Sequence, residues 1–502
     1  MNLLEKARSY ENEYTEIYGE EHPVFHMSPP VGWMNDPNGF SLFRGEYHLF
    51  FQYYPYDTVW GTMHWGHAKT RDFIRWEYLP TALAPDMPYD KNGCFSGSAI
   101  EIDGGKQLIL YSGVTPLNYT LEKPVEDLPP DSDQYQNLCV AIGDGIDFQK
   151  LDTNPMLLAS SAPGQASLVD FRDPKIWQEE DVYYAVVSNR SESSGGDILL
   201  YRSDNCIRWE FCSTLFSNNG NFGKMWECPD LFSLDGKDVL LVSPMEMKKQ
   251  GLEYHDGHVA VAFIGKYDKE NHIFLDEMDQ AIDYGIDFYS TQTLEAKDGR
   301  RIMIAWMQNW GERDIQPEGL HFFGQNTIPR ELEIKEGRLI QNPVREIENY
   351  RQDKVLYHKV DLSSETEGSF LTLPGIEGRV LDMTIQLSTD QPDSFTRFDL
   401  QLAQDENHHL LLQYFPQENI ISVDRRNCGK IQEEVKVGKF YVRDRHGYLK
   451  LRILLDKYSI ELFTNDGEQA ASYVFYTRME ADGIRFRGIG HVQMDIEKYR
   501  IT

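Results

Sequence analysis

The sequence predicts an all-β protein, a five-bladed β-propeller followed by a C-terminal β-sandwich. Short apolar runs rich in β-branched and aromatic residues are separated by Gly, Asp, Asn and Pro, which is typical of strands joined by turns. A short turn motif recurs between residues 70 and 211. The length of 502 residues exceeds that of one ordinary domain and favours two.

The elements follow in order from the N-terminus. Residues 1–24 are predicted to be an N-terminal extension in which 1–20 form a short amphipathic helix. After this extension the chain becomes rich in strands, and we expect the propeller to span residues 25–345. Its most apolar predicted strands are 46–54, 107–113, 182–188, 238–244 and 301–307.

Two observations point to repeated blades. Residues 70–79 and 202–211 share an Asp-x-x-x-Trp core, and 143–151 is a looser relative. Such a short motif could recur by chance, but the richest motifs are also evenly spaced. Asp36, Gly97, Asp173, Glu227 and Tyr289 follow one another at intervals of 54 to 76 positions. In a propeller the innermost strand of each blade lines one channel, so these distant residues would converge there.

After residue 345 the aromatic motifs disappear while strand patterns continue. Residues 449–456 and 459–466 alternate between apolar and polar side chains, as antiparallel strands with one buried face do. We therefore predict a β-sandwich over 355–502, with the linker near 342–354. Packing against the propeller, homodimer formation, or a wall added to a neighbouring subunit's cleft all stay open as its role.

Charge and cysteine usage exclude several classes of function. The net charge of −31 repels nucleic acid and anionic membranes, so neither is an expected partner. No segment is long and apolar enough for a membrane span, and the N-terminus does not resemble a secretory signal, so the predicted location is cytoplasmic. The six cysteines show no metal-ligand spacing, and we predict neither a metal nor a cofactor.

Three acidic residues in distinctive settings carry the chemical prediction. They are Asp36 in WMNDPNG, Asp173 in FRDP and Glu227 in WECPD. Glycoside hydrolysis needs one carboxylate beside the anomeric carbon and one carboxylic acid beside the leaving oxygen. Structural alternatives are a polar turn at Asp36 and an ion pair between Arg172 and Asp173. Asp230 competes with Glu227 but is interpreted as a turn residue.

The motifs WMNDPNG, FSGSA, FRDP, WECPDLF, DFYSTQT, IAWM and TIPREL occur in this order, and together they resemble glycoside hydrolase family 32. That family contains invertases, sucrose-6-phosphate hydrolases and fructan hydrolases. The resemblance covers about residues 25–350, and 451–468 resembles the family's C-terminal sandwich. It implies a five-bladed propeller and a retaining mechanism, with Asp36 as nucleophile, Asp173 as transition-state stabiliser and Glu227 as acid/base.

The resemblance also implies a set of substrate-binding residues, with Cys228 tuning Glu227. They are Asn35, Gln52, Trp60, Phe95, Ser96, Arg172, Cys228, Tyr289 and Trp306. The expected activity is hydrolysis of terminal non-reducing β-fructosyl linkages in sucrose, sucrose 6-phosphate or short fructo-oligosaccharides. A fructosyltransferase is the alternative on the same scaffold. A non-catalytic sugar-binding propeller is disfavoured because all three acidic residues are present.

The sequence leaves two features of substrate choice open. Lys248 and Lys249 could meet a phosphate, although a surface turn explains them as well. The acidic, proline-rich stretch 116–136 is interpreted as a solvated loop that could also roof the cleft.

Overall fold

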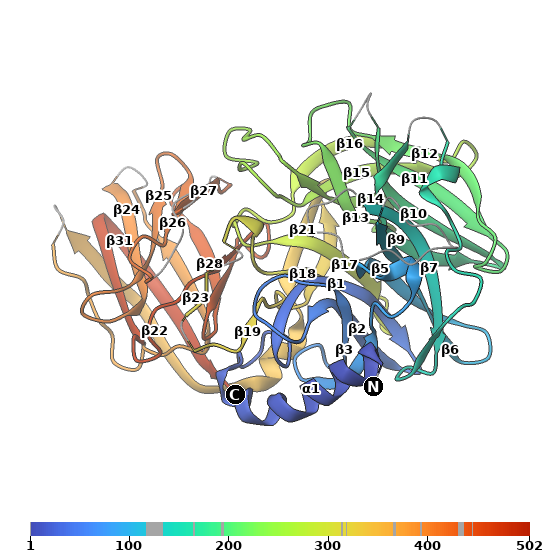
Figure 1. Ribbon diagram of the computed structural model, residues 1–502. Helices are drawn as coiled ribbons and strands as arrows, with labels where there is room; N and C mark the ends of the chain where they lie inside the picture. Colours follow the sequence, from blue (N-terminus) through green and yellow to red (C-terminus); the bar gives the residue numbers. More distant parts are fainter. Residues whose placement is uncertain are drawn as a thin grey trace.

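A five-bladed β-propeller and a C-terminal β-domain lie side by side in the computed structural model, which confirms the predicted fold class (Figure 1). The structure describes residues 2–116, 134–163, 166–191, 195–312, 315–317, 319–364, 368–391, 394–429, 436–443 and 445–502. Most of the acidic stretch 116–136 is therefore outside the described residues.

Each blade is an antiparallel sheet whose strands follow one another along the chain. The blades are β1–β4 (Gly32–Phe43, Glu46–Tyr54, His64–Thr70, Trp76–Leu83), β5–β8 (Gly93–Ile102, Lys106–Pro116, Gln134–Gly143, Phe148–Lys150), β9–β12 (Ala166–Glu179, Val182–Ser191, Gly195–Ser203, Glu210–Ser217), β13–β16 (Met225–Leu234, Lys237–Met245, Val261–Asp268, Ile273–Ala281) and β17, β18, β20, β21 (Tyr289–Glu295, Arg301–Trp306, Arg330–Lys335, Arg338–Pro343). The first strand of each blade contacts the first strands of its two neighbours, which closes the ring around a central channel.

The ring is fastened where its last blade meets its first. The short strand β19 (Phe322–Phe323), which follows β18 in the chain, pairs in parallel with the start of β1. The rings of Trp33 and Phe323 stack there with centroids 4.6 Å apart. Between blades, the apolar faces of neighbouring sheets bury Val, Ile, Leu and aromatic side chains against each other. This burial of flat apolar faces is what holds the blades together.

The N-terminal segment lies along the first blade. Helix α1 (Leu3–Tyr18) begins with a capping box, in which the side chain of Asn2 accepts the Glu5 amide. Arg8 donates to the backbone of Thr81 in β4, and Glu11 accepts the Thr81 hydroxyl. Short 3₁₀ turns are Gly19–Glu21, Pro88–Asp90, Ala159–Ser161, Trp310–Glu312 and Arg345–Tyr350. None of the helices among the described residues is long and apolar enough to cross a membrane.

The C-terminal domain is built around one long strand. Its strands are β22 (Arg351–Ser364), β23 (Leu381–Ser388), β24 (Phe395–Gln404), β25 (Leu410–Phe415), β26 (Ile420–Asp424), β27 (Val437–Tyr441), β28 (Leu449–Leu455), β29 (Ser459–Thr464), β30 (Gln469–Val474) and β31 (Gly483–Ile501). The first half of β31 pairs with β24 and the second half with β22 and β23, so β31 belongs to both layers. Alternate residues such as Leu381, Met383 and Ile385 fill the core between the layers.

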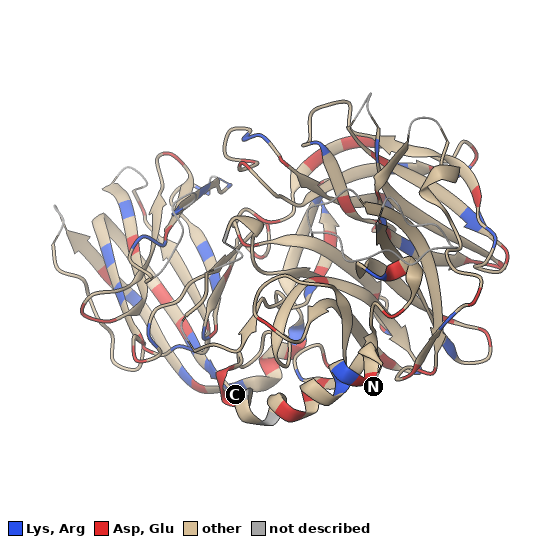
Figure 2. Ribbon diagram, viewed as in Figure 1, with Lys and Arg blue, Asp and Glu red and all other residues tan. Residues whose placement is uncertain are grey.

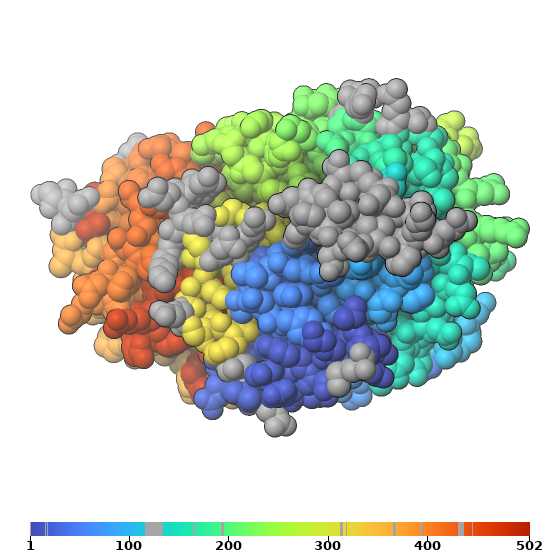
Figure 3. All heavy atoms as spheres, in the orientation of Figure 1, coloured from blue at the N-terminus to red at the C-terminus, as the bar shows by residue number. Residues whose placement is uncertain are grey.

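The two domains are joined by buried ionic contacts as well as by the chain. Figure 3 shows the C-terminal domain, in orange and red, against the propeller with blade five, in yellow, between them. Arg330 of β20 is fully buried and bonds Glu461 of β29 as well as Asp283 of the propeller. His26 bonds Asp456 and Glu461 in the same interface. In Figure 2 the acidic and basic residues are interspersed over both domains.

Candidate active site

All five innermost strands carry a β-bulge near the point where they enter the channel. In β1, β9, β13 and β17 two residues lie opposite one residue of the next strand, and β5 has a single extra residue at Ser96. The doubled positions are Asn35–Asp36, Asp173–Pro174, Cys228–Pro229 and Ser290–Thr291. Asp173, Cys228 and Ser290 have φ values of 58°, 49° and 55°. A bulge turns side chains out of the regular alternation, and two of the bulged residues, Asp36 and Asp173, line the cavity described next.

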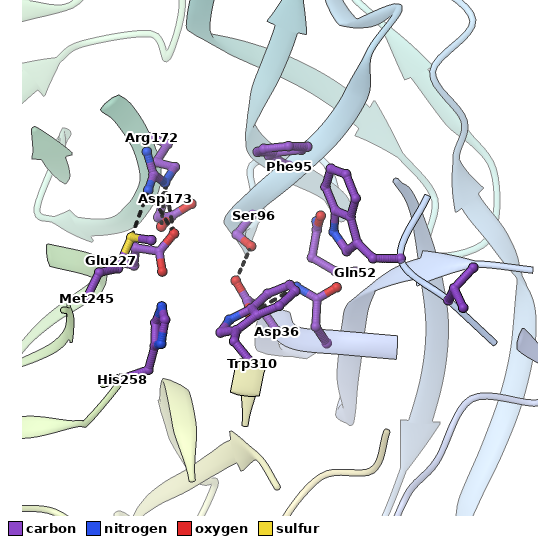
Figure 4. Close-up of a pocket in the computed structure, with 13 residues that line it drawn as sticks. Asp36, Gln52, Phe95, Ser96, Arg172, Asp173, Glu227, Met245, His258 and Trp310 are labelled. Carbon is purple, nitrogen blue, oxygen red and sulfur yellow. Dashed lines mark hydrogen bonds and ion pairs between the residues drawn. The ribbon is translucent and has the colours of Figure 1, made fainter. Parts of the chain in front are cut away.

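The pocket at this end of the channel has a volume of about 630 Å³. Figure 4 shows Asp173 and Glu227 on one side of it and Asp36 on the other, with Phe95 and Ser96 nearby. It is lined by Asn35, Asp36, Gln52, Val59, Trp60, Phe95, Ser96, Arg172, Asp173, Glu227, Met245, His258 and Trp310. Strands of three blades therefore bring the three predicted carboxylates into one cavity, and β5 of a fourth blade adds Phe95 and Ser96.

Asp36 is held by donors from both sides. Its Oδ1 accepts the amide of Asn35 at 3.1 Å, and its Oδ2 accepts the hydroxyl of Ser96 at 2.7 Å. Asn35 is itself oriented by the indole N–H of Trp33, which donates to Asn35 Oδ1 at 2.8 Å. These contacts fix the carboxylate with one face toward the cavity. Burial and the negative charge of Glu227 raise the pKa of Asp36.

Asp173 is tied to blade four. Its Oδ2 accepts the backbone N–H of Cys228 at 3.1 Å, and its own N–H donates to Ser112 Oγ at 3.0 Å. Burial, together with the charges of Glu227 and Asp36, raises the pKa of Asp173 despite the nearby Arg172 guanidinium. Asp36 and Asp173 are therefore each harder to ionise than an isolated aspartate, because burial and the neighbouring negative charges oppose the charged form.

Glu227 lies between a guanidinium and a phenol. Arg172 donates to its Oε1 from Nε at 3.0 Å and from Nη2 at 2.9 Å, while Tyr289 donates to its Oε2 at 2.6 Å. Burial and the charge of Glu227 raise the pKa of Tyr289 well above its usual value, so the phenol keeps its proton. Arg172 also donates to Asp170 and Gln136, which fixes the guanidinium plane.

Three predicted binding residues do not line the cavity. Cys228 is buried beneath it, with Sγ 3.6 Å from Asp36 Oδ2 and 3.8 Å from Asp173 Oδ2, and burial raises its pKa far above 9. Tyr289 reaches the site through Glu227. Trp306 is fully buried and packs against Trp310, whose ring centroid is 5.1 Å away.

The structure adds four lining residues that the sequence reasoning missed. Val59 and His258 lie in loops, Met245 ends β14 and Trp310 begins a 3₁₀ turn. Only Trp310, four positions after the predicted Trp306, had a signal in the sequence. The ring of His258 meets Tyr289 edge-on at 5.2 Å, and burial lowers its pKa. Lys248 and Lys249 are exposed and lie outside the cavity lining. Among the described residues no group of three or more His, Cys, Asp or Glu could hold a metal ion.

A carboxylate cluster with aromatic rings at the mouth of a propeller channel has the groups that a glycoside hydrolase needs. Residues 26–343 match the glycosyl hydrolases family 32 N-terminal domain, and residues 346–502 match the family's C-terminal domain. The chain therefore belongs to glycosyl hydrolase family 32 and is a hydrolase of that family.

This chain is similar to curated relatives and to solved structures over nearly its whole length. A sucrose-6-phosphate hydrolase of Zymomonas mobilis is 36% identical over 94% of this chain and 89% of its own length. A raffinose invertase of Escherichia coli is 33% identical over 92% of this chain and 90% of its own length. A Bombyx mori β-fructofuranosidase, solved as a variant in complex with sucrose, is 32% identical with a TM-score of 0.82, covering 99% of this chain and 97% of its own.

Proposed function

We propose that this enzyme is a retaining β-fructofuranosidase. Its substrates are terminal non-reducing β-D-fructosyl linkages in sucrose, sucrose 6-phosphate or short fructo-oligosaccharides. The observation that carries the proposal is the placement of Asp36, Asp173 and Glu227, from three blades, around one cavity with aromatic walls. The names of the curated relatives and the sucrose complex of the Bombyx mori enzyme support the same substrate class.

The proposed reaction has two steps. Asp36 attacks C2 of the fructosyl unit while Glu227, as the acid, gives a proton to the glycosidic oxygen, and the remaining sugar leaves. Glu227 then takes a proton from water, which attacks C2 and releases Asp36. Asn35 and Ser96 orient Asp36 by their hydrogen bonds, and Tyr289 and Arg172 orient Glu227. Asp173 accepts fructosyl hydroxyls and stabilises positive charge at C2 in the transition state.

The proposal is tested by assaying sucrose, sucrose 6-phosphate, kestose and inulin side by side. We expect fructose from at least one of them, and methyl β-fructoside rather than the α-anomer when methanol competes with water. Inactivity on all four would reject the hydrolysis of fructosides, and the α-anomer would reject retention. Release of glucose in clear excess over fructose at high sucrose would favour the fructosyltransferase alternative.

Two matched variants test the role of Glu227. Glu227→Gln should lower kcat by about 10²–10⁴-fold, because the side chain can no longer transfer a proton. Glu246→Gln is the control, since Glu246 is exposed and pairs with Lys224 outside the cavity lining. Equal activity of the two variants would contradict the assignment.

A further inference from the structure

A second cavity occupies the channel beyond the catalytic carboxylates. Its volume is about 390 Å³, and it is lined by residues that follow the bulges on all five innermost strands, among them Ser41, Glu101, Lys175, Asp230 and Leu294. At its floor Lys175 of β9 and Asp230 of β13 form an ion pair, with Nζ and Oδ2 2.9 Å apart. Asp230 thus lies inside a strand, and its sequence-based interpretation as a turn residue is wrong.

The ion pair is buried, and both of its members also bond to blade five. The side chains of Lys175 and Asp230 are 12% and 2% exposed. Lys175 Nζ also donates to the backbone oxygen of Thr293 at 2.6 Å, and Asp230 Oδ2 accepts the Thr293 N–H at 2.7 Å. Gln292 next to it donates to the backbone oxygen of Gly97 at 3.3 Å. One network therefore joins β5, β9, β13 and β17.

This network lies directly beside the bulges that carry the catalytic residues. Lys175 is two residues after Asp173, and Asp230 is three residues after Glu227. Blades three and four are thus connected here by the Lys175–Asp230 pair and by the bond from the Cys228 N–H to Asp173, in addition to the bonds from Arg172 to Glu227. A bulge leaves a residue unpaired in the ladder, so contacts from outside the sheet contribute to fixing the position of the bulged segment.

We propose that the Lys175–Asp230 pair is a positioning device for catalysis, which holds the bulged segments of β9 and β13 so that Asp173 and Glu227 face the same substrate. This inference rests on the proposed function. A buried ion pair is a poor stabiliser compared with apolar residues of similar volume, because both charges lose their hydration. It does impose a fixed geometry, and catalytic groups misplaced by about 1 Å can lose about 10²-fold in rate.

The test compares Asp230→Asn with Asp382→Asn in the full-length enzyme. Asp382 is an equally buried carboxylate of the C-terminal domain, with a side chain 1% exposed and an ion pair to Arg351 at 2.7 Å. With the best fructoside substrate, kcat, KM and the pH dependence of kcat/KM are measured at least 15 °C below each melting temperature. We expect Asp230→Asn to lower kcat at least tenfold, to change KM less than threefold and to shift a limb of the pH profile. Asp382→Asn should lower only the melting temperature.

A purely structural role would leave the pH profile and the kcat of the folded variant unchanged, so a kcat of Asp230→Asn within threefold of wild type would overturn the inference. If the single variant does not fold, Lys175→Gln/Asp230→Asn removes both charges together and is judged by the same criteria. Failure of both to fold assigns the pair to stability alone and also overturns the inference. Inactivity of the wild type on every fructoside would instead reject the proposed function before any variant is compared.

Discussion

Replacing Arg330 by methionine should destabilise the contact between the two domains strongly. The Arg330 side chain is fully buried and donates to Glu461, Asp283, Gln341 and Ser472. Its removal takes the guanidinium away from the buried Asp283 and leaves His26 as the charged partner of Glu461. Burial raises the pKa of Glu461, but Arg330 and His26 outweigh burial and lower it, so the carboxylate depends on these two partners.

The expected cost follows from this loss of partners. Breaking a buried ion pair by removing one member costs about 3–5 kcal/mol, because an uncompensated charge stays behind. For domains of this size that corresponds to a fall of about 6–20 °C in the melting temperature of the first transition. Differential scanning calorimetry of wild type and Arg330→Met measures it.

An exposed ion pair provides the control for this experiment. Arg202 pairs with Glu210 at 2.9 Å on the propeller surface, where both side chains are more than half exposed. Arg202→Met should leave the melting temperature nearly unchanged, since exposed pairs contribute little. A fall of less than 2 °C for Arg330→Met would show that the interface does not depend on this cation.

Two further predictions concern His26 and the pocket wall. Burial lowers the pKa of His26, but the hydrogen bonds and charges of Asp456 and Glu461 outweigh burial and raise the pKa to about 9. Because this value lies above the usual 6.5, protonated His26 stabilises the fold by about 3 kcal/mol below pH 6.5. This contribution is lost as the pH rises through about 9. Urea unfolding between pH 6 and 9.5 should show the free energy of unfolding falling in wild type and changing less in His26→Gln. Parallel pH profiles of the two proteins would refute this role of His26. Trp310→Ala should raise KM for the fructoside about 3–10-fold through loss of an aromatic wall, whereas the buried Trp306→Phe should leave KM unchanged. A raised KM for Trp306→Phe and an unchanged KM for Trp310→Ala would show that Trp306, and not Trp310, contacts the substrate.

The fold class could be predicted because the strands are visible in the sequence as short apolar runs. The run 46–54 coincides with β2, and 182–188 lies within β10, because a buried central strand needs a nearly continuous apolar stretch. The long strand β31, which belongs to both layers of the C-terminal domain, could not be predicted. Whether β31 belongs to one layer or to both depends on which distant strands pair with it. The alternation of apolar and polar residues within β31 does not specify those partner strands.

Some residues of the candidate site could not be predicted from the sequence either. His258 lies in the loop between β14 and β15, and its place beside Tyr289 results from how that loop crosses the channel mouth. Trp306 and Trp310 are the same residue type, so the sequence does not distinguish them. The strand β18 ends at Trp306, which is buried, and Trp310 in the following turn lines the cavity. The substrate contacts assigned to Cys228 and Tyr289 stay predictions, as does a homodimer through the C-terminal domain, and the KM comparison of Trp306→Phe with Trp310→Ala tests the contact assigned to Trp306.

The turn-like motifs around the carboxylates have a single physical explanation. Pro37, Pro174 and Pro229 each lie in or directly after a bulge of β1, β9 or β13. Proline cannot donate to the strand ladder, so it is tolerated where the ladder is already interrupted. A bulge and a turn therefore favour the same residues, and a sequence with Asp-Pro or Cys-Pro is compatible with both. What distinguishes them here is the apolar sequence on either side, since a bulge is buried in a sheet whereas a turn ends at the surface.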